Sequence, residues 1–160
     1  MGVREELVAV LRPPAELATC FTEWDELERR LGVQVPEDYR WLVETYGQGV
    51  FDEFLHVIQP KSRFPAVRLV SFSQAYRQRL SSQQVSGRSL PCGVHELLSV
   101  ARTEDGDVIS WVMRPSDDSS KWALVVQNSS RTDWHSFPGG IVEFLAAIYL
   151  RDFRMPMFPD

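Results

Sequence analysis

The chain has 160 residues, a formal net charge of -5 and 44% hydrophobic residues, which suits one domain, residues 1–160, with room for a full core. Two cysteines, Cys20 and Cys92, are too few for a disulfide framework, and no apolar run approaches the roughly 20 residues that a membrane-spanning helix needs. No charged segment followed by an apolar run opens the chain, so we expect a soluble, cytoplasmic protein. An acidic chain is repelled by phosphate, which argues against direct binding to nucleic acid.

The charges are distributed unevenly along the chain. Six of the 17 basic residues and none of the 22 acidic ones lie between Phe54 and His95. The six are Lys61, Arg63, Arg68, Arg77, Arg79 and Arg88. Such an asymmetry can steer a charged partner, although a solvated helix face with loops that lack carboxylates explains it as well.

Two short amphipathic helices are predicted in the first 31 residues. Val3 to Leu11 has apolar residues at helical spacing, and Pro13 and Pro14 end it. Thr22 is a good N-cap for a second helix from about Glu23 to Leu31. Because only a short connection follows, we expect this helix to pack against the next one as a helical pair.

The stretch Leu31 to Gly49 carries the strongest helix signal. Pro36 suits the first helical position because its fixed φ fits a helix start, and acidic residues follow at the positive end of the helix dipole. Apolar and aromatic residues at i, i+3, i+4 and i+7 then predict one buried stripe, formed by Tyr39, Leu42, Val43 and Tyr46. Gly47 ends the helix. Trp41 lies off the stripe, which makes it a candidate anchor for a partner.

The pattern changes after the central helix. Val50 to Ile58 is rich in aromatic and branched residues and predicts a strand or an irregular strand pair. Val67 to Val70 predicts a short strand, followed by a helix that a serine caps and that ends at Leu80. The polar stretch Ser81 to Gly93 contains Gly and Pro and is expected to be a loop.

The second half of the chain predicts a mainly antiparallel sheet. Leu97 to Thr103 and Val108 to Arg114 flank an Asp-Gly pair, which is a strong short-range signal for a hairpin. Trp122 to Gln127 and Trp134 to Phe137 predict two more strands, and Pro138 to Arg151 predicts a helix with one apolar stripe. The expected fold class is therefore α+β, with helices packed on a mainly antiparallel β-sheet in a single domain.

Three short motifs carry a family resemblance. The first is the stretch ELERRLGVQVPEDYRWLVETYGQG, which ends at Gly49 and combines a helix, a Leu-Gly pair, a Val-Pro-x-Asp-Tyr helix start and a terminal Tyr-Gly. The second is Asp105-Gly106-Asp107 at a strand entry, and the third combines Trp134 with the triplet Glu143-Phe144-Leu145 inside the last predicted helix. Together these motifs resemble the SMI1/KNR4 family, the core of the SUKH superfamily. Val35 departs from the commoner leucine before proline, and the match leaves the role of residues 61–93 open.

The resemblance implies a protein that works by binding another protein, without catalysis and without a cofactor. For a bacterial member it implies an immunity protein that neutralises a cognate toxin, often a nuclease. A nuclease must hold phosphates, so a basic toxin is expected. The alternative is an intracellular regulatory scaffold like the eukaryotic members, without a toxin partner. A toxin gene immediately upstream is expected only for an immunity protein.

A basic partner is best met by carboxylates on a rigid frame. The candidate partner-binding residues are Glu104, Asp105 and Asp107 at the expected hairpin tip, Asp117 and Asp118 in the next loop, Asp52 and Glu53 beside the central helix, and Trp41. We expect the carboxylates of the tip and of the next loop to lie near one another. Asp is also favoured in turns for its own backbone hydrogen bonds, which explains the tip residues equally well.

Catalytic and metal-binding alternatives find little support. His56, His95 and His135 are far apart in sequence and show no metal-ligand spacing, and the full calcium-loop pattern is missing, so no metal is expected. Cys92 and His95 are the one pair that suggests a nucleophile and a base, yet no family-specific signature surrounds them. An enzyme that uses Cys92 is therefore the third hypothesis.

Overall fold

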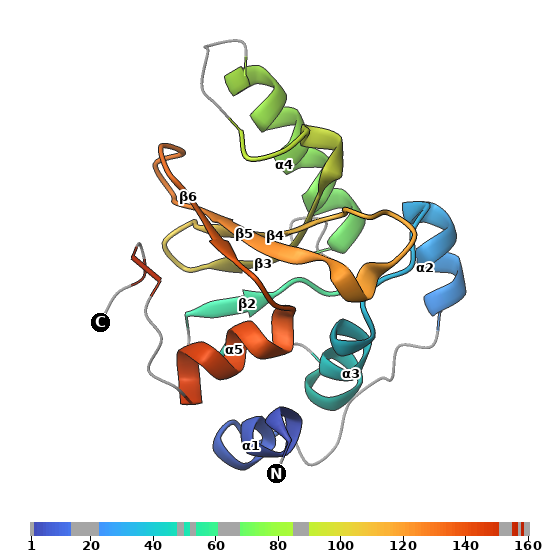
Figure 1. Ribbon diagram of the computed structural model, residues 1–160, viewed down its shortest axis with the longest axis vertical. Helices are drawn as coiled ribbons and strands as arrows, with labels where there is room; N and C mark the ends of the chain where they lie inside the picture. Colours follow the sequence, from blue (N-terminus) through green and yellow to red (C-terminus); the bar gives the residue numbers. More distant parts are fainter. Residues whose placement is uncertain are drawn as a thin grey trace.

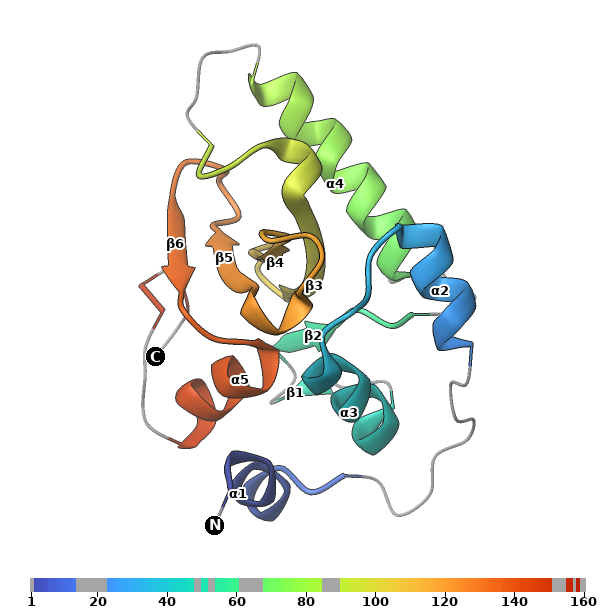
Figure 2. The same cartoon turned by 45° about the vertical axis from the view of Figure 1, so that its right-hand side comes forward.

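The computed structural model describes residues 2–13, 23–47, 50–51, 54–60, 68–84, 90–150, 155–156 and 158. These residues form an α+β fold in which helices pack against an antiparallel sheet (Figures 1 and 2). The fold class predicted from the sequence is thus confirmed. No helix in the described part of the chain is both long and apolar enough to cross a membrane.

Four of the helices lie close to their predicted positions. They are α1 (Val3–Val10), α2 (Trp24–Leu31), α3 (Glu37–Tyr46) and α5 (Ile141–Leu150). Pro36 is the N-cap of α3, with an extended ψ of 142°, so the helix begins one residue later than predicted. Gly32 (φ 77°) follows α2 and Gly47 (φ 63°) follows α3, at backbone angles that disfavour any side chain. Thr22, the predicted N-cap of α2, lies outside the described residues.

The expected contact between α2 and α3 is made by aromatic and charged side chains. The rings of Trp24 and Tyr39 meet edge to face at 6.1 Å, and the guanidinium of Arg40 lies over the Trp24 ring at 5.1 Å. Trp24 Nε1 also donates to Glu44 Oε1 at 3.1 Å. The buried indole is therefore held on both its face and its polar edge.

The sheet is a meander in which each strand pairs antiparallel with the next strand in the sequence. The strands are β1 (Val50–Phe51), β2 (Leu55–Val57), β3 (Leu97–Thr103), β4 (Val108–Val112), β5 (Ala123–Gln127) and β6 (Trp134–Phe137). The predicted hairpin is confirmed, since Arg102 pairs with Val108 across the Asp-Gly turn. A register shift interrupts β3 between Ser99 and Ala101.

The sequence-based prediction is wrong around α4 (Leu69–Gln84). Val70, expected in a strand, lies in the first turn of this helix. Among the described residues of the expected strand, Arg68 alone forms a bridge, an isolated one with Gln59. Leu69 is fully buried, so the short apolar run belongs to the first turn of a buried helix. Periodicity alone cannot distinguish a short buried strand from a buried helical turn. The expected loop from residue 81 also begins too early, because α4 continues to Gln84.

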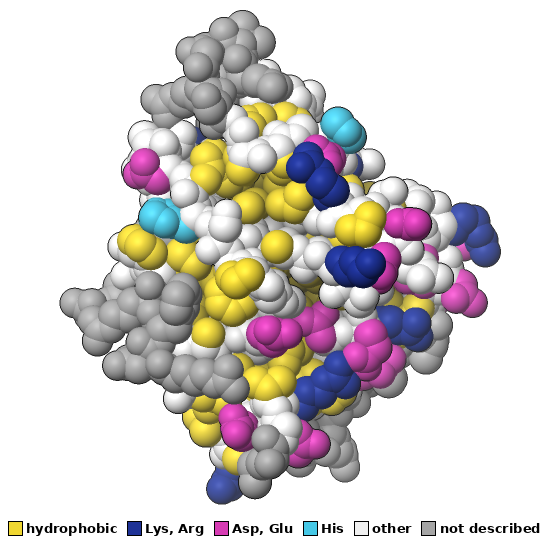
Figure 3. All heavy atoms as spheres, viewed as in Figure 1, with side chains coloured by type: hydrophobic (Ala, Val, Ile, Leu, Met, Phe, Trp, Pro, Cys, Tyr) yellow, Lys and Arg dark blue, Asp and Glu magenta, His cyan; other side chains and the backbone are white. Residues whose placement is uncertain are grey.

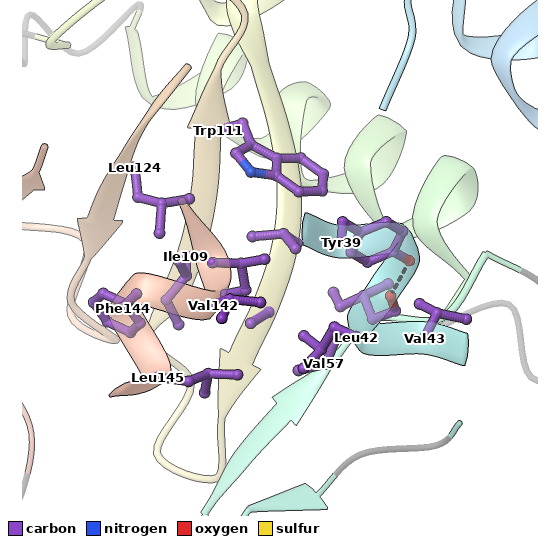
Figure 4. Packing of buried hydrophobic residues seen from close by; sticks show 14 of the residues in the cluster. Tyr39, Leu42, Val43, Val57, Ile109, Trp111, Leu124, Val142, Phe144 and Leu145 are labelled. Carbon is purple, nitrogen blue, oxygen red and sulfur yellow. Dashed lines mark hydrogen bonds between the residues drawn. The ribbon is translucent and has the colours of Figure 1, made fainter. Parts of the chain in front are cut away.

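Alternation along the strands divides the core into a larger cluster, on the face of the sheet that packs with α3 and α5, and a smaller cluster, on the face that packs with α4. Ile109, Trp111 and Leu124 point to one face of the sheet, where they pack with α3 and α5 (Figure 4). Val108 and Val125 point to the other face and pack with α4. Such two-sided burial matches the period of two that a strand imposes on its side chains.

We expect Leu42→Ala to lower the free energy of unfolding by roughly 2 to 5 kcal/mol, because it empties a volume inside the larger cluster. Leu42 is 1% exposed and lies on the inner face of α3. The measurement is equilibrium unfolding in denaturant. Arg30→Ala, on the exposed side of α2, is the control and should change the value by less than about 0.5 kcal/mol. An equally small change for Leu42→Ala would contradict the assigned face of α3.

Candidate partner-binding surface

The first turn of α3 joins several parts of the core. Tyr39 is fully buried, and its hydroxyl donates to the carbonyl of Ile58 at 2.6 Å. The Tyr39 ring also meets the Trp111 ring edge to face at 5.2 Å (Figure 4). Asp38 Oδ2 accepts the N–H of Val142, in the first turn of α5, at 3.2 Å. Tyr39 is therefore inaccessible to a partner, and the half-buried Asp38 is engaged with α5.

The room for the Asp38 carboxylate depends on Gly140. A Cβ atom on Gly140 would overlap with Asp38 Oδ2, so a side chain at this position would displace the carboxylate. Burial raises the pKa of Asp38, while the N–H groups of Val142 and Tyr39 oppose that rise. The carboxylate is thus held in a narrow space between the starts of two helices, where the helix dipoles favour negative charge.

The β3–β4 turn presents two exposed carboxylates on a fixed backbone. Glu104 and Asp105 are exposed, and Gly106 takes the left-handed φ of 96° that the turn requires. Asp107 is buried instead: its carboxylate accepts Thr103 Oγ1–H at 2.9 Å and the Ser129 N–H at 2.9 Å. Asp107 therefore fixes the turn from inside, and Glu104 and Asp105 are its exposed carboxylates. Glu104 Oε1 also contacts His56 Nε2, on the neighbouring strand β2.

The neighbouring β5–β6 turn supports the β3–β4 turn from the side. Arg131 has a φ of 59°, unusual for a residue with a side chain, and its Nη1 donates to the carbonyls of Gly106 (3.1 Å) and Asn128 (3.3 Å). Asn128 Oδ1 accepts the N–H groups of Thr132 and Asp133, both at 2.9 Å. Neither Arg131 nor Asn128 is among the candidates predicted from the sequence, although Asn in a polar stretch between two strands is a turn signal.

The β4–β5 loop carries the second pair of acidic candidates. Asp117 is exposed, whereas Asp118 Oδ1 accepts the Ser120 N–H at 3.1 Å and so caps a short 3-10 helix, Ser119–Lys121. The hydrogen bond from the Ser120 hydroxyl lowers the pKa of Asp118, and Lys121 Nζ lies 3.7 Å from its carboxylate. The charge of the Asp118 carboxylate is therefore already compensated by Lys121, whereas Asp117 is exposed.

The expectation that these two acidic groups lie near each other is wrong. β4 begins at the turn with Glu104 and Asp105, where Val108 pairs with Gln127, and ends at the loop with Asp117 and Asp118, where Val112 pairs with Ala123. Five residues at about 3.4 Å each separate the ends of the strand by roughly 17 Å. Consecutive turns of an antiparallel meander alternate between the two ends of the sheet, so two successive loops cannot lie side by side.

The remaining candidates lie elsewhere. Trp41 is half-buried, and the guanidinium of Arg4 lies over its ring at 5.2 Å while also pairing with Glu37. Part of the indole is therefore covered by α1 and not free for a partner. Asp52 and Glu53 lie outside the described residues. The flanking Phe51 and Leu55 pair with each other.

A helical pair that leads through a Pro-x-Asp-Tyr turn into an antiparallel meander fits a known family. A SUKH family model described as SMI1-KNR4 cell-wall matches residues 22–145. The chain belongs to the SMI1-KNR4 family. No curated protein and no solved structure gives a significant match. The matched residues of this SMI1-KNR4 domain run from before α2 into α5 and include α4, whereas α1 precedes them.

The surroundings of Cys92 in this SMI1-KNR4 domain do not favour a catalytic thiol. Cys92 is half-buried, and burial, followed by the nearby Glu96 carboxylate, raises the pKa of its thiol. A raised pKa keeps the sulfur protonated at neutral pH, whereas a nucleophile needs the thiolate. Within the described ranges, no group of three His, Cys, Asp or Glu side chains is placed to hold a metal ion.

We expect Asp38→Ala to lower the free energy of unfolding by about 1 to 3 kcal/mol, because it leaves the Val142 N–H without its acceptor. Asp38→Asn is the matched variant, since its amide oxygen can still accept that N–H, and it should cost less. The measurement is equilibrium unfolding at neutral pH. Equal losses for the two variants would show that the hydrogen bond contributes nothing measurable.

The pH dependence of stability tests the same carboxyl group. Because its pKa is raised above the ordinary 3.8, the folded state binds more protons between the two pKa values, and stability falls as the pH rises through that interval. Glu37 and Asp118, whose pKa values are lowered, contribute with the opposite sign. The difference in free energy of unfolding between Asp38→Asn and the wild type isolates the contribution of Asp38. As the pH rises above about 4, this difference should change in favour of the variant.

Proposed function

We propose that this SMI1-KNR4 protein is a cytoplasmic immunity protein that binds a basic bacterial toxin and neutralises it by direct contact. Membership in the family supports a protein-binding role. The observation that carries the proposal is the β3–β4 turn, where exposed Glu104 and Asp105 stand on a backbone fixed by the buried Asp107. Carboxylates on a backbone fixed this way attract a basic cleft at a lower cost of ordering on contact than those of a flexible loop.

The surroundings of the turn favour it over the other acidic parts of the surface. The guanidinium of Arg131 donates to the carbonyls of Gly106 and Asn128, and exposed Asp133 adds negative charge in the neighbouring turn. Over α2 and α3, in contrast, basic and acidic side chains alternate, as Figure 3 shows at the lower right. Mixed charges largely cancel at a distance, so that surface produces a weaker field for steering a charged partner.

Because the two acidic groups lie at opposite ends of β4, each serves as the control for the other. Glu104→Gln/Asp105→Asn and Asp117→Asn/Asp118→Asn remove the same charge and keep the oxygen atoms that the turns use. We expect the first double variant to slow association with a basic toxin more than it speeds dissociation, and to flatten the dependence on salt. The second should leave the association rate unchanged.

The binding partner for this measurement is the product of the gene immediately upstream, and association is followed by surface plasmon resonance at low and high salt. A reversed result, with the loss confined to Asp117→Asn/Asp118→Asn, would move the interface to the opposite end of the sheet. If neither double variant changes the association rate at low salt, the acidic surface is not used. If the upstream product does not bind at all, the regulatory scaffold becomes the better hypothesis.

Cys92→Ser should leave binding and protection of the cell unchanged, because a protonated, half-buried thiol contributes no nucleophile. Serine is close in size and keeps a hydroxyl in place of the thiol. The measurement is survival of cells that express the toxin together with either variant. Loss of protection by a variant that folds normally would contradict the proposed mechanism and favour an enzyme.

A further inference from the structure

The helix α4 is attached to the rest of the fold in two different ways along its length. Its first turn is rooted in the larger cluster, where Leu69 is fully buried and its N–H donates to the Gln59 carbonyl at 2.8 Å. From Ser73 onward it lies on the opposite face of the sheet, and its last turns extend past the strands in both ribbon views (Figures 1 and 2). We call residues 73–84 the α4 arm.

Polar groups make much of the contact between the α4 arm and the sheet. Ser73 Oγ accepts the Ser99 N–H at 3.1 Å, and Ser99 Oγ lies 3.1 Å from Ser110 Oγ. The Tyr76 hydroxyl donates to Gln127 Oε1 at 2.6 Å. Such bonds replace bonds to water when the arm packs, so each contributes only about 1 kcal/mol to the closed state.

The apolar contribution of the arm is also small. Tyr76 and Leu80 are the buried residues that it adds to the smaller cluster, where they meet Leu97, Val108 and Val125 of the sheet. Burying one such side chain contributes about 1.5 to 3 kcal/mol, whereas fixing the backbone of each residue costs about 1 to 2 kcal/mol. A helix of this length is marginal in water on its own. The arm is therefore held less strongly than α3 and α5, which bury four and six residues.

We propose that the α4 arm opens from the sheet as a unit, turning on the buried first turn of α4, while the larger cluster stays folded. Opening uncovers the hydroxyls of Ser99 and Ser110 and the side chains of Val108 and Val125. Arg131 connects this motion to the β3–β4 turn: its guanidinium lies over the Tyr76 ring at 5.4 Å, and its Nη1 donates to the Gly106 carbonyl. The arm and the turn thus share one side chain.

Native-state hydrogen exchange in low concentrations of denaturant tests the proposal on the wild-type protein. We expect the backbone N–H groups of the arm to exchange through an opening that depends weakly on denaturant, because little surface is exposed. Those of α3, α5 and β4 should exchange only through global unfolding, with a steep dependence. If the N–H groups of the arm show the same opening free energy and the same dependence on denaturant as those of β4, the proposal is wrong.

Tyr76→Phe provides a second measurement because it removes the bond to Gln127 and keeps the ring. We expect exchange in the arm to become about tenfold faster, with no change in α3 and α5. Arg79→Gln, on the exposed side of the arm, is the control and should change neither. Faster exchange throughout the protein in Tyr76→Phe would show that the arm does not open independently. This inference does not depend on the toxin-binding function.

Discussion

The fold depends on the buried hydroxyl of Tyr39. A phenol that is removed from water must find an acceptor within the protein, and the acceptor here is the Ile58 carbonyl, just past the end of β2. Burial raises the pKa of Tyr39 well above its ordinary value, so the hydroxyl keeps its proton and remains a donor. This bond sets the position of α3 relative to β2, and the edge-to-face contacts of the ring set the positions of Trp24 and Trp111.

The residue before it, Asp38, extends the same arrangement to α5. Its carboxylate faces the N–H groups at the start of α5, while its own backbone lies in the first turn of α3. One charged group therefore serves two helix starts, and Gly140 leaves the space for it. The short Pro-x-Asp-Tyr motif of the family thus has a physical explanation in the packing of the domain, separate from any contact with a partner.

The sequence predicted those elements whose signal is local. The buried stripe of α3 and the hairpin around Gly106 were predicted correctly, because helical spacing and an Asp-Gly turn act over only a few residues. The start of α4 was not, because the burial of Leu69 depends on residues far away in the chain. Likewise, the sequence identifies Asp107 as a turn carboxylate, but only its contact with Ser129, 22 residues later, shows that it points inward. The exposed candidates were found by residue type alone, and their separation follows from topology.

The meander and the contact between α3 and α5 differ in how much chain they must close. From β3 to β6 each strand pairs with the next one across a short connection, while the connection from β2 to β3 contains α4. The Asp38–Val142 bond joins residues 104 positions apart. Closing a longer loop costs more chain entropy, and the gain comes only after the ends meet. During synthesis the part of the sheet from β3 to β6 can therefore assemble hairpin by hairpin while Asp38 remains in water. The carboxylate loses its hydration only when α5 has left the ribosome and packs against α3.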